Sequence, residues 1–363
     1  MPKLVVKNLR KVFGTFEAVK DVSFQVEEKE TLCLLGPSGC GKTTTLRIIA
    51  GLEVPTSGEV FLDGILVNDV LPQKRQIGLV FQDYAIFPHL SVFENIAYGL
   101  RVRKVPEAQI RKKVHDTAAL IDVENILDMS GKKLGLSEMQ RVAIGRSIVL
   151  DPKLLLLDEP LSNIDAKARE RMRAELGKLQ KEIGIATVYV THDQLEAMTL
   201  ADRIAVMRDG LIEQMGTTSE IYDNPRTLFV ANFIGSPSMN LMDCEPVYSE
   251  GRVVLKSGDF SLDITEFAET VKSKSKGKEL VLGIRPEDVS LDVDKTDPKA
   301  MEAEVQLVEP IGAKSIYHLK IGGPAILSKD RAMPEVNVGS KVWATFNKDK
   351  LHIFDKKIEE AIF

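Results

Sequence analysis

Short apolar runs alternate with amphipathic segments over the first two thirds of the chain. The apolar runs predict buried strands at ETLCLLG (Glu30–Gly36), IGLVFQ (77–82), KLLLLDEP (Lys153–Pro160), TVYVTHD (187–193) and RIAVMRDG (203–210). Helical spacing appears in KTTTLRIIAGL, which ends near Gly51, and in the charged segment 166–184. Strands separated by helices are typical of a largely parallel sheet, so we expect an α/β domain over residues 1–235.

Two further regions depart from this alternation. Between about Ser91 and Leu150 the strand signals stop, and PEAQIRKKVHDTAALIDV and EMQRVAIGRSIVL predict a helical insertion over 91–150. After NFIGSPSMN, short strand-like segments separated by turn residues predict an all-β domain over 236–363, of the small-barrel type. These segments are RVVLKS, ELVLGIRPEDV, AEVQLVEPIG, SIYHLKIG, KVWATF and KLHIF. We interpret the basic stretch Lys272–Lys278 as a solvated turn rather than a nucleic-acid patch.

Composition restricts the class of protein further. The 363 residues are 44% hydrophobic and 28% charged, which is an ordinary globular balance. The net charge of −5 gives no general attraction to nucleic acid, and three cysteines without a CxxC pair favour buried thiols in a reducing compartment. The chain has no apolar run of about 18–20 residues and no signal-peptide pattern at its start. We therefore expect a soluble chain that acts at a membrane only through a partner.

The segment GPSGCGKTT fits the phosphate-loop pattern G-x-x-x-x-G-K-[ST] between a predicted strand and a predicted helix. Its glycines let successive N–H groups surround a phosphate, and the helix adds its positive end. Lys42 should reach the β- and γ-phosphates of ATP, and Thr43 should bind Mg²⁺. This context disfavours a chance glycine turn. The predicted nucleotide-binding residues are Gly36, Pro37, Ser38, Gly39, Cys40, Gly41, Lys42, Thr43 and Thr44.

Two carboxylates follow the apolar run of KLLLLDEP. Because ligands of such sheets lie at the carboxyl ends of strands, Asp158 is placed to hold Mg²⁺, directly or through water. Glu159 points elsewhere and can polarise an attacking water as a general base. A strand ending in a polar turn is the alternative, and the phosphate loop makes it the weaker one.

With these motifs the chain resembles the ATP-binding-cassette (ABC) ATPases over nearly its whole length. The resemblance implies a P-loop cassette followed by an OB-like barrel of the TOBE type. It implies that Gln82 links the metal and the water to membrane subunits, and that His192 contacts the γ-phosphate and the attacking water. Gln82 would also be a metal ligand. Without the resemblance, His192 would more often be a structural histidine at a strand end.

The resemblance assigns two further positions. Phe13 matches the aromatic residue that stacks on adenine, with a core role as the alternative. The segment LSNID, Leu161–Asp165, matches the loop that crosses to a second subunit and makes Asp165 a cross-subunit residue.

The C-terminal segments GIRPEDV and VEPIGAKSIYHLKIGG resemble the sugar-importer branch. This implies import of a di- or oligosaccharide by a homodimer beneath two integral membrane permease subunits, with a solute-binding protein engaged indirectly and no nucleic acid bound. The chain would be peripheral, at the cytoplasmic face of the cell membrane. The permease should dock near Tyr84–Val92, where Ile86, Phe87 and Leu90 are apolar and could also be ordinary core.

One motif is altered. The family signature L-S-G-G-[QE], whose N–H groups grip the γ-phosphate of the other subunit, is replaced by LGLSE, Leu134–Glu138. In a gapped register Leu136 and Ser137 are the L-S pair; in an ungapped register Gly135, Leu136 and Ser137 occupy the S, G and G positions. We favour the ungapped register because the chain from Gln82 to Asp158 has the length usual for the branch. Leu136 then adds a side chain where the phosphate needs the backbone close.

This alteration gives a hypothesis: ATP-driven dimerisation and hydrolysis are weakened, while ATP binding to one subunit is largely kept. A shifted loop that brings Ser137 to the phosphate is the alternative. Three other functions remain to be weighed: an importer for a polyamine, iron or phosphate, a catalytically weak regulatory cassette, and a soluble cassette acting on nucleic acid or ribosomes. The last is disfavoured because the chain holds one cassette and is acidic.

Overall fold

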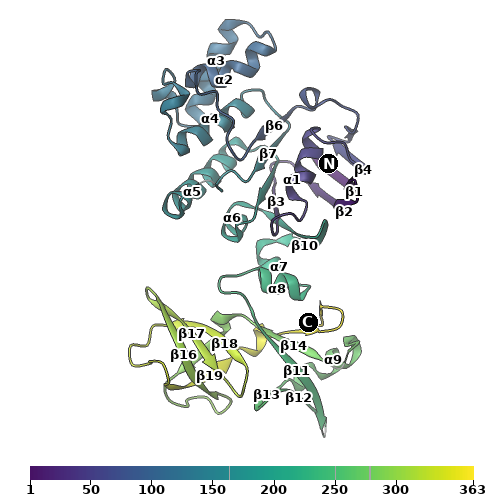
Figure 1. The fold of residues 1–363 in the computed structure, drawn as a ribbon, viewed down its shortest axis with the longest axis vertical. Coiled ribbons are helices and arrows are strands. Elements are labelled where there is room, and N and C mark those ends of the chain that lie inside the picture. The colour runs from purple at the N-terminus through teal and green to yellow at the C-terminus, as the bar shows by residue number, and fades with distance from the viewer. Residues whose placement is uncertain (163, 250, 278) are drawn as a thin grey trace. The chain divides into compact units, whose positions relative to one another are not determined.

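The computed structural model describes residues 1–162, 164–249, 251–277 and 279–363, so Asn163 of LSNID and Lys278 of the basic stretch lie outside the described residues. The chain divides into two compact units, Met1–Thr218 and Ser219–Phe363 (Figure 1). This division falls before the boundary near residue 235 that the sequence predicts. Residues 219–235, which lie between the observed and the predicted boundary, belong to the second unit. The buried guanidinium of Arg285 ties them to it, because it donates to the carbonyls of Tyr222 and Ile234.

A mixed sheet forms the centre of the first unit, in the order β5-β4-β1-β2-β10-β9-β3-β8-β7-β6. The strands are β1 Leu4–Phe13, β2 Phe16–Val26, β3 Thr31–Leu35, β4 Ser57–Leu62, β5 Ile65–Leu66, β6 Ile77–Val80, β7 Leu154–Asp158, β8 Thr187–Thr191, β9 Arg203–Arg208 and β10 Leu211–Thr217. The run from β9 to β6 is parallel and confirms the five strands predicted from apolar runs. The expectation of a largely parallel sheet is wrong for the other half, because β1 pairs antiparallel with β2 and β4.

The burial of the strands explains why the parallel half of the sheet has a clear apolar pattern in the sequence and the antiparallel half does not. Every residue of β3, β7 and β8 is buried, so these strands are nearly continuous apolar runs. In β1 and β2, buried and exposed positions mix and the pairing register shifts several times. The alternation that marks a half-buried strand is thereby broken.

The helices of the first unit follow the prediction closely. The helices α1 Lys42–Ala50 and α6 Gln194–Leu200 pack against the sheet, and α5 Ala166–Ile183 packs against α6. The helical insertion contains α2 Val92–Val102, α3 Glu107–Leu120 and α4 Leu136–Ile148, and short 3₁₀ turns lie at Pro72–Lys74, Glu124–Ile126 and Gly131–Lys133. Figure 1 shows α2, α3 and α4 gathered at one end of this unit. The helix α1 ends at Gly51, as expected, with a left-handed φ of 79°.

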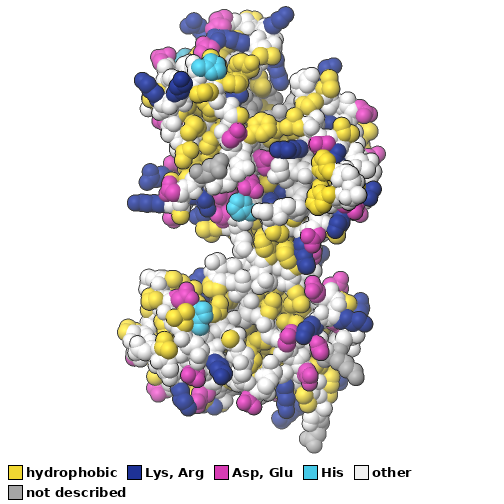
Figure 2. Space-filling view, viewed as in Figure 1, with side chains coloured by type: hydrophobic (Ala, Val, Ile, Leu, Met, Phe, Trp, Pro, Cys, Tyr) yellow, Lys and Arg dark blue, Asp and Glu magenta, His cyan; other side chains and the backbone are white. Residues whose placement is uncertain are grey.

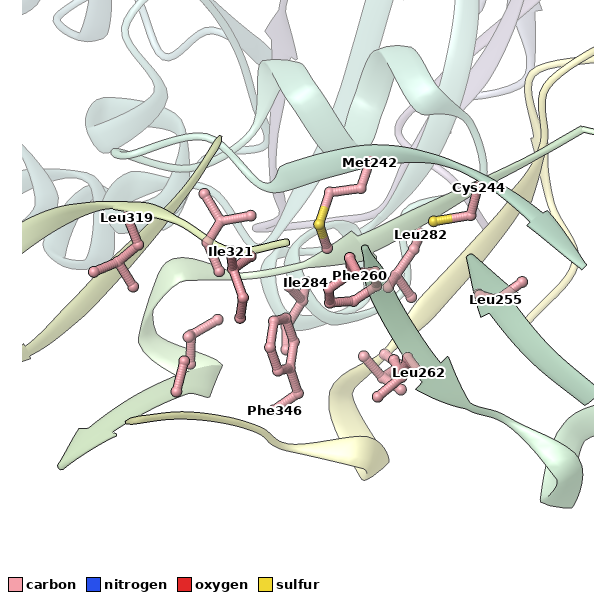
Figure 3. Close-up of a cluster of buried hydrophobic side chains, with 14 of the residues drawn as sticks. Met242, Cys244, Leu255, Phe260, Leu262, Leu282, Ile284, Leu319, Ile321 and Phe346 are labelled. Atoms are coloured by element: carbon pink, nitrogen blue, oxygen red, sulfur yellow. The ribbon is translucent and has the colours of Figure 1, made fainter. Parts of the chain in front are cut away.

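The second unit contains two antiparallel sheets. One has the order β13-β12-β11-β14-β20-β21 and the other β15-β19-β16-β17-β18. The strands are β11 Asn240–Ser249, β12 Arg252–Ser257, β13 Phe260–Asp263, β14 Leu280–Ile284, β15 Val289–Asp292, β16 Met301–Ile311, β17 Lys314–Lys320, β18 Ala325–Arg331, β19 Lys341–Phe346, β20 His352–Asp355 and β21 Glu360–Ala361. One hydrophobic core joins both sheets: Leu282 and Ile284 come from the first and Leu319 and Phe346 from the second (Figure 3).

Short helices accompany these sheets: α7 Thr218–Asp223, α8 Leu228–Phe233 and α9 Ala268–Lys274, with 3₁₀ turns at Thr265–Phe267, Pro286–Asp288 and Lys348–Lys350. The basic stretch interpreted as a turn is therefore partly helical, because Lys272 and Lys274 form the last turn of α9. Cationic side chains are favourable at that end of a helix, next to its unpaired carbonyls.

The Arg285 side chain generates a stability prediction. It is 2% exposed and stacks 3.9 Å from the centre of the Tyr222 ring while donating to two carbonyls. Arg285→Ala should lower the free energy of unfolding by about 3 kcal/mol, since it leaves two buried acceptors unpaired. The fluorescence of Trp343, the single tryptophan and a residue of β19, reports urea unfolding of this unit.

Arg331→Ala is the matched control. Its side chain is 69% exposed in an ion pair with Asp292, and its loss should change the free energy of unfolding by less than about 0.5 kcal/mol. Equal urea midpoints for the two variants would contradict the role given to Arg285.

Candidate functional site

The loop between β3 and α1 is held close to the neighbouring backbone. A Cβ on Gly36 would lie 2.2 Å from the carbonyl oxygen of Met207, and one on Gly41 would lie 2.5 Å from that of Ala18. Gly41 precedes the first helical residue with a left-handed φ of 103°, which only glycine adopts readily. Both positions therefore require glycine, and the turn points the start of α1 at the loop interior, as a phosphate site needs.

Lys42 is the first residue of α1 and is 4% exposed. Its Nζ donates to the carbonyls of Gly36 at 2.8 Å and Pro37 at 2.9 Å, and lies 3.7 Å from Sγ of Cys40. Burial raises the pKa of the Cys40 thiol, so this neighbour is a neutral one. An ammonium group has three donors, and those that hold the loop carbonyls can turn to a phosphate oxygen.

Thr43 joins this loop to the end of β7. Its Oγ1 donates to Oδ1 of Asp158 at 3.1 Å. Burial, above all, raises the pKa of the Asp158 carboxyl, which is 8% exposed. A hydroxyl and a carboxylate in contact are the oxygen ligands that Mg²⁺ prefers. The structure thus brings together two of the three predicted metal ligands.

Glu159 and His192 meet at the carboxyl ends of β7 and β8. Oε2 of Glu159 lies 3.0 Å from Nδ1 of His192, and the histidine side chain is 52% exposed. Glu159 has a left-handed φ of 46°, and its N–H donates to the carbonyl of Val190 at 3.0 Å. The carboxylate of Asp193, which follows His192, accepts from Leu195 N at 2.8 Å and so begins α6. The pair is consistent with a carboxylate base oriented by a histidine.

Two further predicted ligand positions, Gln82 and Phe13, are exposed, as are Pro37, Ser38 and Gly39 of the phosphate loop, while Thr44 is half-buried. Gln82 is exposed and lies two residues after the end of β6, the strand that pairs with β7. The Phe13 side chain is 45% exposed at the end of β1, with Lys11 Nζ 4.7 Å from its ring centre. Phe13 is therefore not core, and its ring can stack on a base. Phe16, which pairs with Phe13 and is 62% exposed, is a second aromatic face that the sequence analysis missed.

The predicted cross-subunit residues line one hollow of about 580 Å³ between the starts of α4 and α5. They are Gly135, Leu136, Ser137 and Asp165. Gly135 precedes α4, and its N–H donates to the Glu138 carboxylate at 2.7 Å. Leu136 is 41% exposed, and Ser137 Oγ donates to Glu175 at 3.3 Å. At this end of α4, the Gly135 N–H is bound by the chain's own carboxylate and the leucine side chain faces solvent.

The segment Tyr84–Val92, predicted to receive a permease, is held by side chains of the helical insertion. Asn95 of α2, which is fully buried, accepts from Phe87 N at 2.9 Å and donates to the carbonyls of Phe87 and Ser91. The Arg146 guanidinium of α4 lies 4.4 Å from the centre of the Phe87 ring. A hollow of about 230 Å³, lined in part by Phe81, Tyr84 and Arg146, opens beside it.

The chain is similar in sequence to known proteins. Three family models match: ABC transporter over residues 19–162, MalK OB fold domain over 235–289 and TOBE domain over 282–354. The trehalose/maltose import ATP-binding protein MalK of Thermococcus litoralis is 45% identical, covering 97% of each chain. The sn-glycerol-3-phosphate import ATP-binding protein UgpC of Psychromonas ingrahamii is 42% identical, covering 100% of this chain and 96% of the relative.

A solved structure is also similar. The cbiO1 protein of Clostridium perfringens, part of the ABC transporter complex cbiONQ, is 29% identical with a TM-score of 0.56, and the match covers 61% of this chain and 90% of that one. The match to full-length relatives and the three consecutive family models lead to one conclusion. The chain belongs to the family of ABC transporter ATP-binding subunits, with a cassette followed by OB-fold and TOBE segments.

Proposed function

We propose that the chain hydrolyses ATP to power the import of a sugar of the di- or oligosaccharide class. The observation that carries the proposal is the contact of Glu159 with His192 at 3.0 Å, beside the contact of Thr43 with Asp158 at 3.1 Å. The sugar class is supported by the similarity to the trehalose/maltose protein MalK.

Each side chain has a separate role in the proposed hydrolysis. Lys42 and the loop N–H groups bind the β- and γ-phosphates, and Thr43, Asp158 and Gln82 would hold Mg²⁺. Mg²⁺, when bound, offsets the negative charge of the phosphates. Glu159 takes a proton from the attacking water, and His192 orients the Glu159 carboxylate and the γ-phosphate.

The proposed assembly is a homodimer beneath two permease subunits. The hollow formed by Gly135, Leu136, Ser137 and Asp165 would face the nucleotide of the other copy, and two-fold symmetry would complete both sites. In each copy, the hollow beside Tyr84–Val92 would receive a short helix from one permease subunit. A solute-binding protein would act through the permease.

The proposed location is the cytoplasmic face of the cell membrane, through these partners. Within the part of the chain that the structure describes, no helix has the length and apolar character needed to cross a membrane.

Two alternatives have specific support. The similarity to the glycerol-phosphate protein UgpC supports another solute. The start of α4, where Glu138 binds the Gly135 N–H and Leu136 faces solvent, supports a catalytically weak regulatory cassette. A role on nucleic acid has less support, because basic and acidic side chains are interspersed on the face drawn in Figure 2 and the net charge is −5.

The role of Glu159 as general base predicts a loss of hydrolysis without a loss of nucleotide binding. Glu159→Gln should lower kcat for ATP hydrolysis at least about 100-fold, because the amide cannot accept the proton of the attacking water. Equilibrium binding of a fluorescent ATP analogue should stay within about threefold, since Lys42 and the loop are untouched. A variant that keeps its hydrolysis rate would remove Glu159 from the reaction.

If the altered signature weakens hydrolysis, restoring the family sequence should raise ATPase activity. The combined change Gly135→Ser, Leu136→Gly and Ser137→Gly should raise steady-state ATPase activity about tenfold or more, because it frees the backbone at the start of α4 for a phosphate of the other subunit. Nucleotide affinity at protein concentrations too low for dimerisation should not change. Unchanged activity would show that LGLSE is a working signature, with Ser137 reaching the phosphate through a shifted loop.

A further inference from the structure

The backbone carbonyl of Pro160 is a meeting point of three segments of the first unit. The Tyr84 hydroxyl donates to it at 3.0 Å, and Nε2 of Gln140 on α4 lies 3.5 Å from it. Both side chains are buried, at 5% and 4% exposed. Tyr84 and Pro160 are 76 residues apart in the chain, so one side chain links the segment after β6 to the residue that follows Glu159.

The backbone of Glu159 needs such support. Its left-handed φ of 46° is costly for a residue with a side chain and persists only where the surroundings hold it. Its N–H is fixed by Val190, and its carbonyl accepts from N and Oγ of Ser162 at 3.2 and 3.0 Å. Pro160 has no N–H, so its carbonyl is the one main-chain group through which it can be hydrogen-bonded.

Tyr84 also lines the hollow of about 230 Å³ beside Tyr84–Val92. Tyr84 and Ala85 both have a left-handed φ, of 61° and 47°, and the Arg146 guanidinium donates to the Ala85 carbonyl. Burial raises the pKa of Tyr84 to about 12, so its hydroxyl keeps its proton and remains a donor at neutral pH. A rearrangement of this segment therefore moves or breaks the bond to Pro160.

We propose that Tyr84 is a positioning residue: its hydroxyl fixes the Glu159–Pro160 segment and so makes the placement of the Glu159 carboxylate depend on the state of the neighbouring hollow. This inference rests on the proposed ATPase function. One buried hydrogen bond, from Tyr84 to Pro160, would then connect the surface where the permease docks with the carboxylate that activates water.

Tyr84→Phe in the full-length chain tests the inference, because it removes the hydroxyl and keeps the ring. We expect kcat for ATP hydrolysis to fall about tenfold, with KM for ATP within about twofold, since a misplaced base slows the reaction without weakening binding. In a Glu159→Gln background, measured by single-turnover hydrolysis of radiolabelled ATP, the same change should alter the rate less than about twofold. Such non-additivity is expected only if Tyr84 acts through Glu159.

Tyr317→Phe is the matched control. Its buried hydroxyl also donates to a backbone carbonyl, that of Arg331, at 3.0 Å, and it accepts in addition from Met333 N at 2.8 Å, within the second unit. Because two hydrogen bonds are lost, it should lower the melting temperature at least as much as Tyr84→Phe does, and it should leave kcat within about twofold.

Two results would overturn the inference: a kcat unchanged by Tyr84→Phe, or an equal fall in kcat with and without the Glu159 carboxylate. A wild-type chain that hydrolyses no ATP would overturn the proposed function itself and this inference with it. An active wild type with an unaffected Tyr84→Phe variant would overturn this inference alone.

Discussion

The pairing of three buried strands is the constraint on which the rest of the cassette depends. Leu35 lies opposite Thr191 across β3 and β8, and Asp158 lies opposite Val190 across β7 and β8, so all three strands end at one edge of the sheet. The phosphate loop follows β3, Asp158 is the last residue of β7 with Glu159 directly after it, and His192 follows β8. Since every residue of the three strands is buried, a shift in register would exchange the side chains packed on the two covered faces and disrupt that packing, so the core fixes the geometry of the site.

The parts of this arrangement that sequence reasoning recovered are those with a local signal. Apolar runs marked β3, β6, β7, β8 and β9, and motif residues marked the chemistry at their ends. The strands β1, β2 and β4 were missed because irregular pairing breaks their alternation. Long-range contacts had no signal at all: nothing near Tyr84 in the sequence indicates that its hydroxyl reaches Pro160, and nothing near Arg285 indicates that it binds the segment before residue 235.

The altered signature illustrates how function and folding can separate. A helix start needs its first N–H groups satisfied, and at α4 Glu138 meets part of that need through Gly135. Leu136 is partly exposed there, so its side chain does not disturb the packing of the insertion. The helix can therefore form normally while, in the proposed homodimer, it would present a different surface to the nucleotide of the other subunit. Such a change affects what the chain offers to a partner and leaves its own site intact.

The shared sheet of the second unit limits how its OB-fold and TOBE segments can be inherited. The OB-fold and TOBE models meet at residues 282–289, within and just after β14. That strand pairs with β11 on one side and with β20, near the end of the chain, on the other. The two segments therefore close one sheet and share one core, and neither is a separable module. A gene rearrangement that divided them would leave two incomplete sheets, so evolution can exchange this unit only as a whole.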